Sequence, residues 1–103
     1  MITLVPGQTQ SLTANAVSHN NIQVSWQTPE KQNGKLTKYM LYYNSSHELP
    51  SVTVAIAASE TKYELTNLTG NTTFFIWISA HTSKGPGPLV GPVIVTTGLW
   101  RIS

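Results

Sequence analysis

The sequence contains no cysteine, no aspartate and few charged residues of either sign. Without cysteine the chain can form no disulfide, no thiolate metal ligand and no cysteine nucleophile. Charged residues make up 10% of the chain, well under the roughly 25% of an average domain. The net charge is only +2 and the basic residues form no dense cluster, so we expect no nucleic-acid partner.

Long apolar runs are also missing. No stretch approaches the roughly 18 apolar residues of a membrane span, so we expect no direct membrane contact. The opening letters, MITLVPGQTQ, lack the basic region and the long apolar region of a signal peptide. If the parent protein is secreted, we therefore expect this chain to be one excised module of it.

The residues needed for catalysis or for metal binding are scattered. His19, His47 and His81 fall in or beside separate turns, and no aspartate is present to orient any of them. A catalytic triad, a carboxylate pair or a metal site needs several such side chains to converge in a cleft. We therefore expect no enzyme activity, no metal and no cofactor.

What the sequence does have is alternation of apolar and polar residues, which is typical of half-buried β-strands. Seven short segments show it, separated by turns rich in Gly, Pro and Asn. The segments are residues 10–17, 21–26, 36–43, 51–57, 61–65, 72–81 and 92–97. No stretch of ten or more residues has a helical period. The pattern predicts an all-β fold, a seven-stranded antiparallel immunoglobulin-like β-sandwich.

The alternation also predicts which side chains face the core, with Trp26 at its centre. The expected inward residues are Leu12 with Ala14 or Ala16, Ile22, Val24, Trp26, Tyr39, Leu41, Tyr43, Val52, Val54, Ile56, Tyr63, Leu65, Phe74, Ile76, Ile78, Ala80, Val93, Val95 and Thr97.

Five motifs occur in order along nearly the whole chain. They are IQVSWQTP, LTKYMLYY, TKYELTNL, FFIWISA and SKGPGPLVGPVIVTT. Together they resemble the B, C, E, F and G strand patterns of the fibronectin type III family. The resemblance places the domain at residues 8–98, with residues 1–7 as a linker or cloning remnant and residues 99–103 as a C-terminal linker remnant.

Two positions depart from the family pattern. Phe74 stands where the family usually has tyrosine, and Gly70 stands where it usually has proline. The tyrosine hydroxyl normally ties the preceding turn back to the backbone. Because Phe74 lacks that hydroxyl, we expect a looser turn before it.

The segment at 72–81 raises a question of function, because its second stripe is also apolar. In the family fold the expected outward residues of neighbouring strands would form one patch: Met40, Tyr42, Phe75, Trp77 and Ile94. Contiguous apolar patches and exposed aromatics tend to mark protein contact surfaces. Cross-strand aromatic pairs that only stabilise the sheet would give the same pattern, so both interpretations remain open.

Two further sets of residues are candidates for contacts or modification. The loops after Trp26 and after the segment 72–81 would share one end of the sandwich, where Lys31, Lys35 and Lys84 could contact an acidic partner. Three Asn-X-Ser/Thr motifs make candidate N-glycosylation sites, each expected in a loop at a strand end. Their asparagines are Asn44, Asn67 and Asn71.

The resemblance implies a non-catalytic module of a larger receptor or adhesion protein. The segments NGKLTKYMLYY and SKGPGP are similar to modules of cell-surface adhesion and guidance receptors of the DCC/neogenin kind and of receptor-type tyrosine phosphatases. We therefore expect an extracellular, glycosylated spacer that is a monomer in isolation and contacts a protein partner or a neighbouring module. The alternatives are an intracellular scaffold module and an accessory spacer of a secreted polysaccharide-degrading enzyme.

Overall fold

The computed structural model describes residues 7–30, 34–45 and 52–98, and every element in them is a β-strand. The strands are β1 (Gln10–Ala16), β2 (Ile22–Gln27), β3 (Leu36–Ser45), β4 (Val52–Ala57), β5 (Lys62–Leu65), β6 (Thr73–Thr82), β7 (Gly85–Pro86) and β8 (Val90–Thr96).

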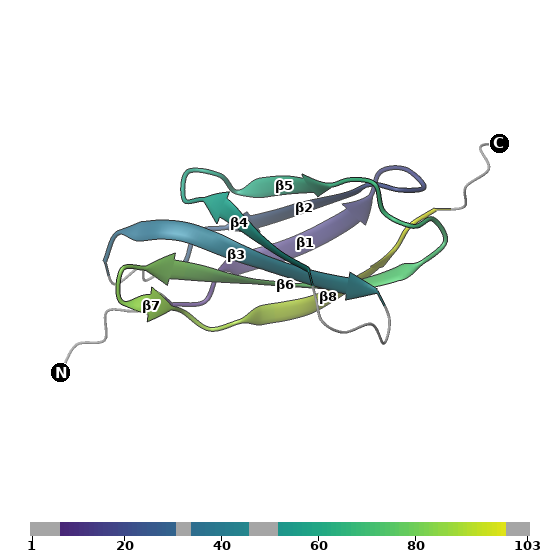
Figure 1. Ribbon diagram of the computed structural model, residues 1–103. Coiled ribbons are helices and arrows are strands. Elements are labelled where there is room, and N and C mark those ends of the chain that lie inside the picture. Colours follow the sequence, from purple (N-terminus) through teal and green to yellow (C-terminus); the bar gives the residue numbers. More distant parts are fainter. Residues whose placement is uncertain (1–6, 31–33, 46–51, 99–103) are drawn as a thin grey trace.

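The strands form two sheets that lie face to face (Figure 1). The smaller sheet has the order β1-β2-β5. In the larger sheet β4, β3 and β6 are neighbours, and both β7 and β8 pair with β6. All strand pairs are antiparallel. The predicted sandwich is therefore confirmed, and its eighth strand is β7, a two-residue strand in the turn after β6.

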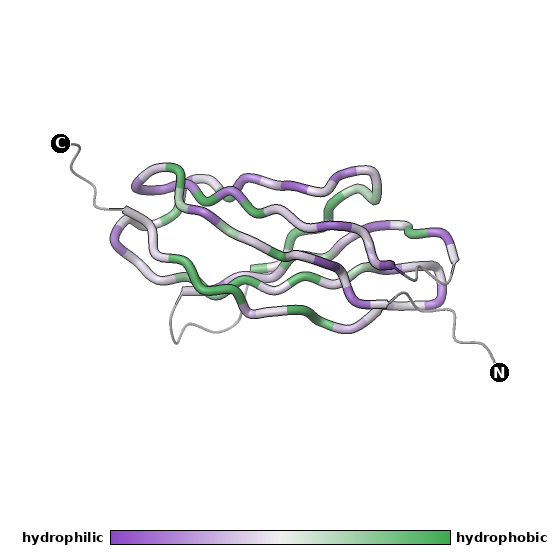
Figure 2. Tube along the Cα trace, turned by 180° about the vertical axis from the view of Figure 1, so that it is seen from behind, coloured by the Kyte–Doolittle hydropathy of each residue, from purple (hydrophilic) through white to green (hydrophobic). Residues whose placement is uncertain are grey.

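The core lies between the sheets and follows the predicted alternation. Apolar and polar residues alternate along the strands in Figure 2. Trp26 is 3% exposed and packs edge-to-face on the fully buried Tyr39, with ring centroids 5.4 Å apart. Around them lie the other buried apolar residues: Ile22, Val24, Leu41, Ile56, Leu65, Phe74, Ile76, Ile78 and Ala80. The prediction that Trp26 is central to the core is confirmed.

The prediction of a buried, inward-facing side chain is wrong for two residues. Val52 is 49% exposed and Tyr63 is 38% exposed. They lie on β4 and β5, which are edge strands, since among the described residues β4 pairs only with β3 and β5 only with β2. A strand at the edge of a sheet has a neighbouring strand on one side only. A side chain that points inward from it is therefore left open to solvent on the other side. Among the alternatives for β1, Leu12 and Ala14 pack against the core, whereas Ala16 is exposed.

The turn between β5 and β6 is tied by a hydroxyl that the sequence analysis did not foresee. Thr97, just after β8, is 2% exposed. Its Oγ1 accepts a hydrogen bond from the backbone N of Thr72 at 3.0 Å and donates to the carbonyl of Thr69 at 2.7 Å. The missing hydroxyl at Phe74 therefore does not leave this turn untied, contrary to the expectation of a looser turn.

Replacing Thr97 with valine, which has nearly the same shape, should remove these hydrogen bonds and little else. Because the backbone groups at Thr69 and Thr72 would lose a partner in a part-buried site, we expect a loss of about 1–3 kcal/mol in the free energy of unfolding. Urea denaturation would measure it. Thr97→Ser keeps the hydroxyl and is the control. A valine variant as stable as the serine variant would show that the hydroxyl does not hold the turn.

Candidate functional site: the outer face of the larger sheet

The larger sheet turns an apolar stripe away from the core. Tyr42 pairs with Trp77, and Phe75 pairs with Ile94, so β3, β6 and β8 each contribute to the same side. Their neighbours along each strand, such as Leu41 and Ile76, are fully buried on the other side. We call the five residues of this stripe the outer face: Met40, Tyr42, Phe75, Trp77 and Ile94. The structure places all five on this side of the sheet, away from the core.

The outer face is partly covered by its own packing. The rings of Phe75 and Trp77 are stacked, with centroids 6.5 Å apart and planes 23° apart. Trp77 also lies against the backbone of β8, since a Cβ built on Gly91 would be 3.3 Å from Trp77 Cδ1. Ile94 remains 62% exposed, whereas the other four residues are half-buried. The stripe therefore stabilises the sheet and still offers an apolar surface.

Farther along β6 the same side carries a serine and a histidine. Ser79 Oγ lies 3.3 Å from His81 Nε2. Burial, and to a smaller extent the charge of Lys38, lowers the pKa of His81. Ser79 is only 2% exposed, so its hydroxyl is closed to a substrate. The pair is a packing contact and not a nucleophile with its base.

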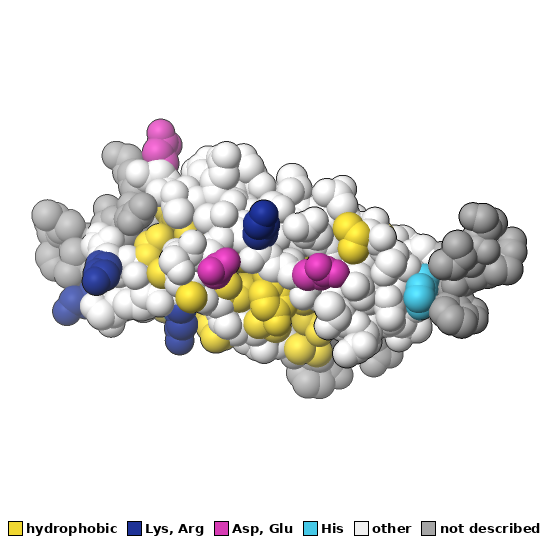
Figure 3. Space-filling view, turned by 90° about the horizontal axis from the view of Figure 1, so that it is seen from above, with side chains coloured by type: hydrophobic (Ala, Val, Ile, Leu, Met, Phe, Trp, Pro, Cys, Tyr) yellow, Lys and Arg dark blue, Asp and Glu magenta, His cyan; other side chains and the backbone are white. Residues whose placement is uncertain are grey.

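The predicted lysine contacts gather at one end of the sandwich. Leu36 at the start of β3 pairs with Thr82 at the end of β6, which brings the loops of Lys35 and Lys84 together. Both lysines are exposed, and Figure 3 shows lysine side chains gathered at one end of the molecule. Lys31 lies outside the described residues.

The three candidate asparagines occupy two kinds of position. Asn67 and Asn71 are exposed in the turn between β5 and β6, with φ of 59° and 51°. Asn44 lies within β3 and not in a loop, which corrects the expectation for it. The reason is that β3 continues to Ser45, because β6 is long enough to pair with it as far as Phe74.

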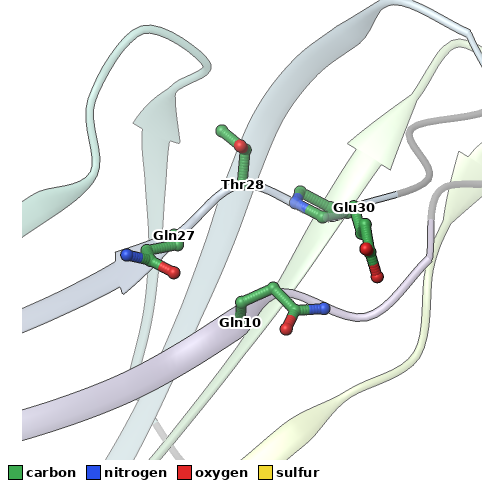
Figure 4. Close-up of a pocket in the computed structure, with 5 residues that line it drawn as sticks. Gln10, Gln27, Thr28 and Glu30 are labelled. Carbon is green, nitrogen blue, oxygen red and sulfur yellow. The ribbon is translucent and has the colours of Figure 1, made fainter.

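The surface hollows are lined by few charged or reactive side chains. An open hollow where β1 begins and β2 ends is lined by Gln10, Gln27, Thr28, Pro29 and Glu30 (Figure 4). These are polar or neutral side chains apart from one carboxylate, and Gln10 and Gln27 are simply paired across the strands. Within residues 7–30, 34–45 and 52–98 no three His, Asp or Glu side chains could hold a metal ion.

No helix in the part of the chain that the structure describes is long and apolar enough to cross a membrane.

Comparison with known proteins gives the same family that the motifs resemble. A family model described as "Fibronectin type III domain" matches residues 7–96. The chain is 36% identical over 97 residues to neuronal cell adhesion molecule of Mus musculus. It is 34% identical over 77 residues to netrin receptor DCC of Homo sapiens, and 31% identical over 93 residues to receptor-type tyrosine-protein phosphatase F of Bos taurus. The similarity to receptors of the DCC kind and to receptor-type phosphatases is confirmed.

The matches differ greatly in how much of each protein they cover. The three alignments include 90%, 72% and 85% of this chain, but only 8%, 5% and 5% of those proteins. Among solved structures, the FN1–FN3 domains of chicken CNTN1 superpose with a TM-score of 0.81 at 25% identity, over 90% of this chain and 32% of that one. The chain is thus similar to one module of much longer proteins.

Proposed function

Because the chain belongs to the fibronectin type III family, we propose that it is a non-catalytic extracellular module of a larger cell-surface adhesion or guidance receptor. In this role residues 8–98 form the folded module. It separates its neighbours as a spacer and contacts another protein, and it is a monomer in isolation. Its relatives support this proposal, since they are adhesion molecules and receptors by name.

The outer face is the observation that carries the contact role. It combines stacked aromatic rings with an isoleucine that is 62% exposed. Exposed apolar patches mark contact surfaces, and aromatic residues and methionine are enriched there. Lys35 and Lys84, at the end of the same sheet, would add attraction to an acidic partner at the rim.

Extracellular placement is supported by the three Asn-X-Ser/Thr motifs at Asn44, Asn67 and Asn71. The absence of cysteine is equally compatible with an intracellular scaffold module. An accessory spacer of a secreted polysaccharide-degrading enzyme is the third possibility. Expression in mammalian secretory cells separates the first two, because glycan mass on the chain favours the extracellular module.

Replacing Trp77 with serine tests the contact role. Trp77 is half-buried on the outer side of the sheet, so the domain should still fold, with a loss of about 1 kcal/mol from cross-strand pairing. Loss of an aromatic anchor at a contact surface should weaken binding roughly tenfold or more. The measurement is flow cytometry of the fluorescent, tetramerised domain on a panel of intact cells, alongside thermal unfolding.

Val17→Ser is the matched control, since Val17 is 53% exposed beyond the end of β1 in the other sheet. It should leave cell binding unchanged. If Trp77→Ser folds and binds as the natural domain does, the outer face is not the contact surface. If the natural domain binds no cell in the panel, the contact role itself is wrong. If Trp77→Ser fails to fold, the stripe is structural.

A further inference from the structure

The outer face ends at an asparagine that carries a glycosylation motif. Asn44 follows Tyr42 by two positions in β3, so both side chains leave the same side of the sheet. Its partner across the sheet is Phe75 on β6. Directly opposite residues of antiparallel strands have Cβ atoms about 4.5–5.5 Å apart. A group attached to Asn44 Nδ2 therefore begins within one side-chain length of the Phe75 ring.

Phe75 lies in the middle of a continuous apolar strip. It stacks on Trp77 along β6, and on its far side it pairs with Ile94 of β8. The strip therefore runs from Asn44 across three strands, and it is open at Ile94. A ring with an apolar face could lie on Phe75 and remove apolar area from water.

The rim beside Phe75 is polar and, among the described residues, uncharged. The hydroxyls of Thr73 and Thr96 lie 2.9 Å apart on the next paired position of β6 and β8. The pair Lys38 and His81 lies on the same side of the sheet, but six residues farther along β3, about 20 Å away. An occupant of this end needs an apolar face and hydrogen-bonding groups, and it needs no charge. A neutral sugar has both.

The other two motifs lack this setting. In the part of the chain that the structure describes, Asn67 and Asn71 lie in the turn before β6 and not in a strand, so neither has a cross-strand partner. The backbone N of Asn71 donates instead to the carbonyl of Gly98 at 2.8 Å. Asn44 alone among the three asparagines has an aromatic ring as its cross-strand partner.

We propose that Asn44 carries an N-linked glycan whose first N-acetylglucosamine packs on Phe75, a proposal that rests on the extracellular function above. Ser46, which completes the motif in the sequence, lies outside the described residues. In the transfer step, Nδ2 of Asn44 gives a proton to a base of the glycosyl-transferring enzyme and forms a bond to C1 of the sugar. The bond from C1 to the pyrophosphate of a lipid-linked oligosaccharide donor breaks, and the lipid pyrophosphate leaves.

The glycan would divide the outer face between two occupants. It covers Phe75, and it leaves Trp77, Met40 and the exposed Ile94 open to a protein partner. Occupancy at Asn44 would then fix the direction from which a partner approaches.

The test is a double-mutant cycle on the secreted chain. Residues 1–103 are expressed behind a secretory signal in mammalian cells as the natural sequence, Asn44→Gln, Phe75→Thr and the double variant. Intact mass gives glycan occupancy and thermal unfolding gives the midpoint. We expect Asn44→Gln to remove one glycan mass and to lower the midpoint by about 4 °C. In the Phe75→Thr background the same substitution should change the midpoint by less than about 1 °C.

Two controls make the result specific. The same four proteins made in bacteria carry no glycan, and there the coupling of Asn44→Gln to Phe75 should be much smaller, limited to the direct contact of the two side chains. Asn67→Gln should show no coupling to Phe75 in either host. If Phe75→Thr is not secreted, Phe75→Val replaces it, because valine keeps the β-branched shape of threonine and is apolar like its neighbours Trp77 and Ile94.

An unoccupied Asn44 overturns the proposal, as does an occupied Asn44 whose effect on the midpoint is the same with and without Phe75. Neither result bears on the contact role, which is tested separately by the binding of Trp77→Ser to cells. Conversely, unimpaired cell binding by Trp77→Ser, together with intact coupling between Asn44 and Phe75, would overturn the contact surface and leave the glycan in place.

Discussion

Replacing Trp26 with alanine is expected to lower the free energy of unfolding by about 3–5 kcal/mol. Trp26 is 3% exposed, and its ring meets Tyr39 at 5.4 Å between the two sheets. The substitution removes the indole contacts and leaves a cavity that residues from both sheets would have to close. A small domain has only about 5–15 kcal/mol of stability in all, so much of the population would unfold at moderate temperature. Urea denaturation followed by circular dichroism would measure the loss.

Trp26→Phe is the control for this substitution. Trp26 Nε1 is buried and makes no hydrogen bond of good geometry within the described residues, although it lies near enough to the Tyr39 hydroxyl to oppose the rise that burial causes in the pKa of Tyr39. Phenylalanine therefore gives up at most a weak polar contact and keeps a ring against Tyr39, so its loss should be clearly smaller than that of alanine. Equal losses in the two variants would mean that the ring contact does not hold the two sheets together.

Adding a single methyl group at Gly91 should be nearly as damaging. Gly91 has φ of +120°, a conformation that residues with a side chain rarely adopt, and a Cβ there would lie 2.6 Å from the carbonyl oxygen of Ile76. The same Cβ would lie 3.2 Å from Trp77 Cα. Both are backbone atoms that cannot rotate away, so β8 would have to shift from β6. We expect Gly91→Ala to cost about 2–5 kcal/mol.

Gly98 provides a matched control two residues beyond β8. A Cβ on Gly98 would meet only His19 Cα, at 3.9 Å, which is an ordinary contact. Gly98→Ala should therefore change the free energy of unfolding by no more than about 0.5 kcal/mol. Comparing the two urea midpoints isolates the effect of position. If Gly91→Ala is no less stable than Gly98→Ala, β8 does not need a glycine against Trp77.

The strands and most of the core could be predicted because alternation is a local property of the sequence. Ile22, Val24 and Trp26 have nearly ideal spacing, and all three are buried as expected. The same reasoning failed for Val52 and Tyr63, since alternation says which way a side chain points and not whether another strand covers it. Coverage depends on which strands lie at the edges, and that is settled by the pairing of segments far apart in the chain.

The features that were missed in the fold and at the candidate site are all long-range. The bond between Thr97 and Thr69 joins residues 28 positions apart, and nothing in the turn sequence points to it. The packing of Trp77 on Gly91 is of the same kind. The position of Asn44 opposite Phe75 depends on how far β3 and β6 stay paired. The order of strands in the family pattern was enough to predict the outer face. That prediction depends only on which alternate residues of each strand point outward, and not on the register between strands.

The arrangement of β1 and β8 determines how the domain would respond to mechanical tension. The described chain begins near one end of the sandwich at the start of β1 and leaves at the opposite end after β8 (Figure 1). Pulling on these two ends loads β1 against β2, and β8 against β6, along the strand direction. Ladder hydrogen bonds run perpendicular to the strands, so such a pull shears many of them at once instead of unzipping them in turn. A pull along the chain would therefore be resisted by many ladder hydrogen bonds at the same time.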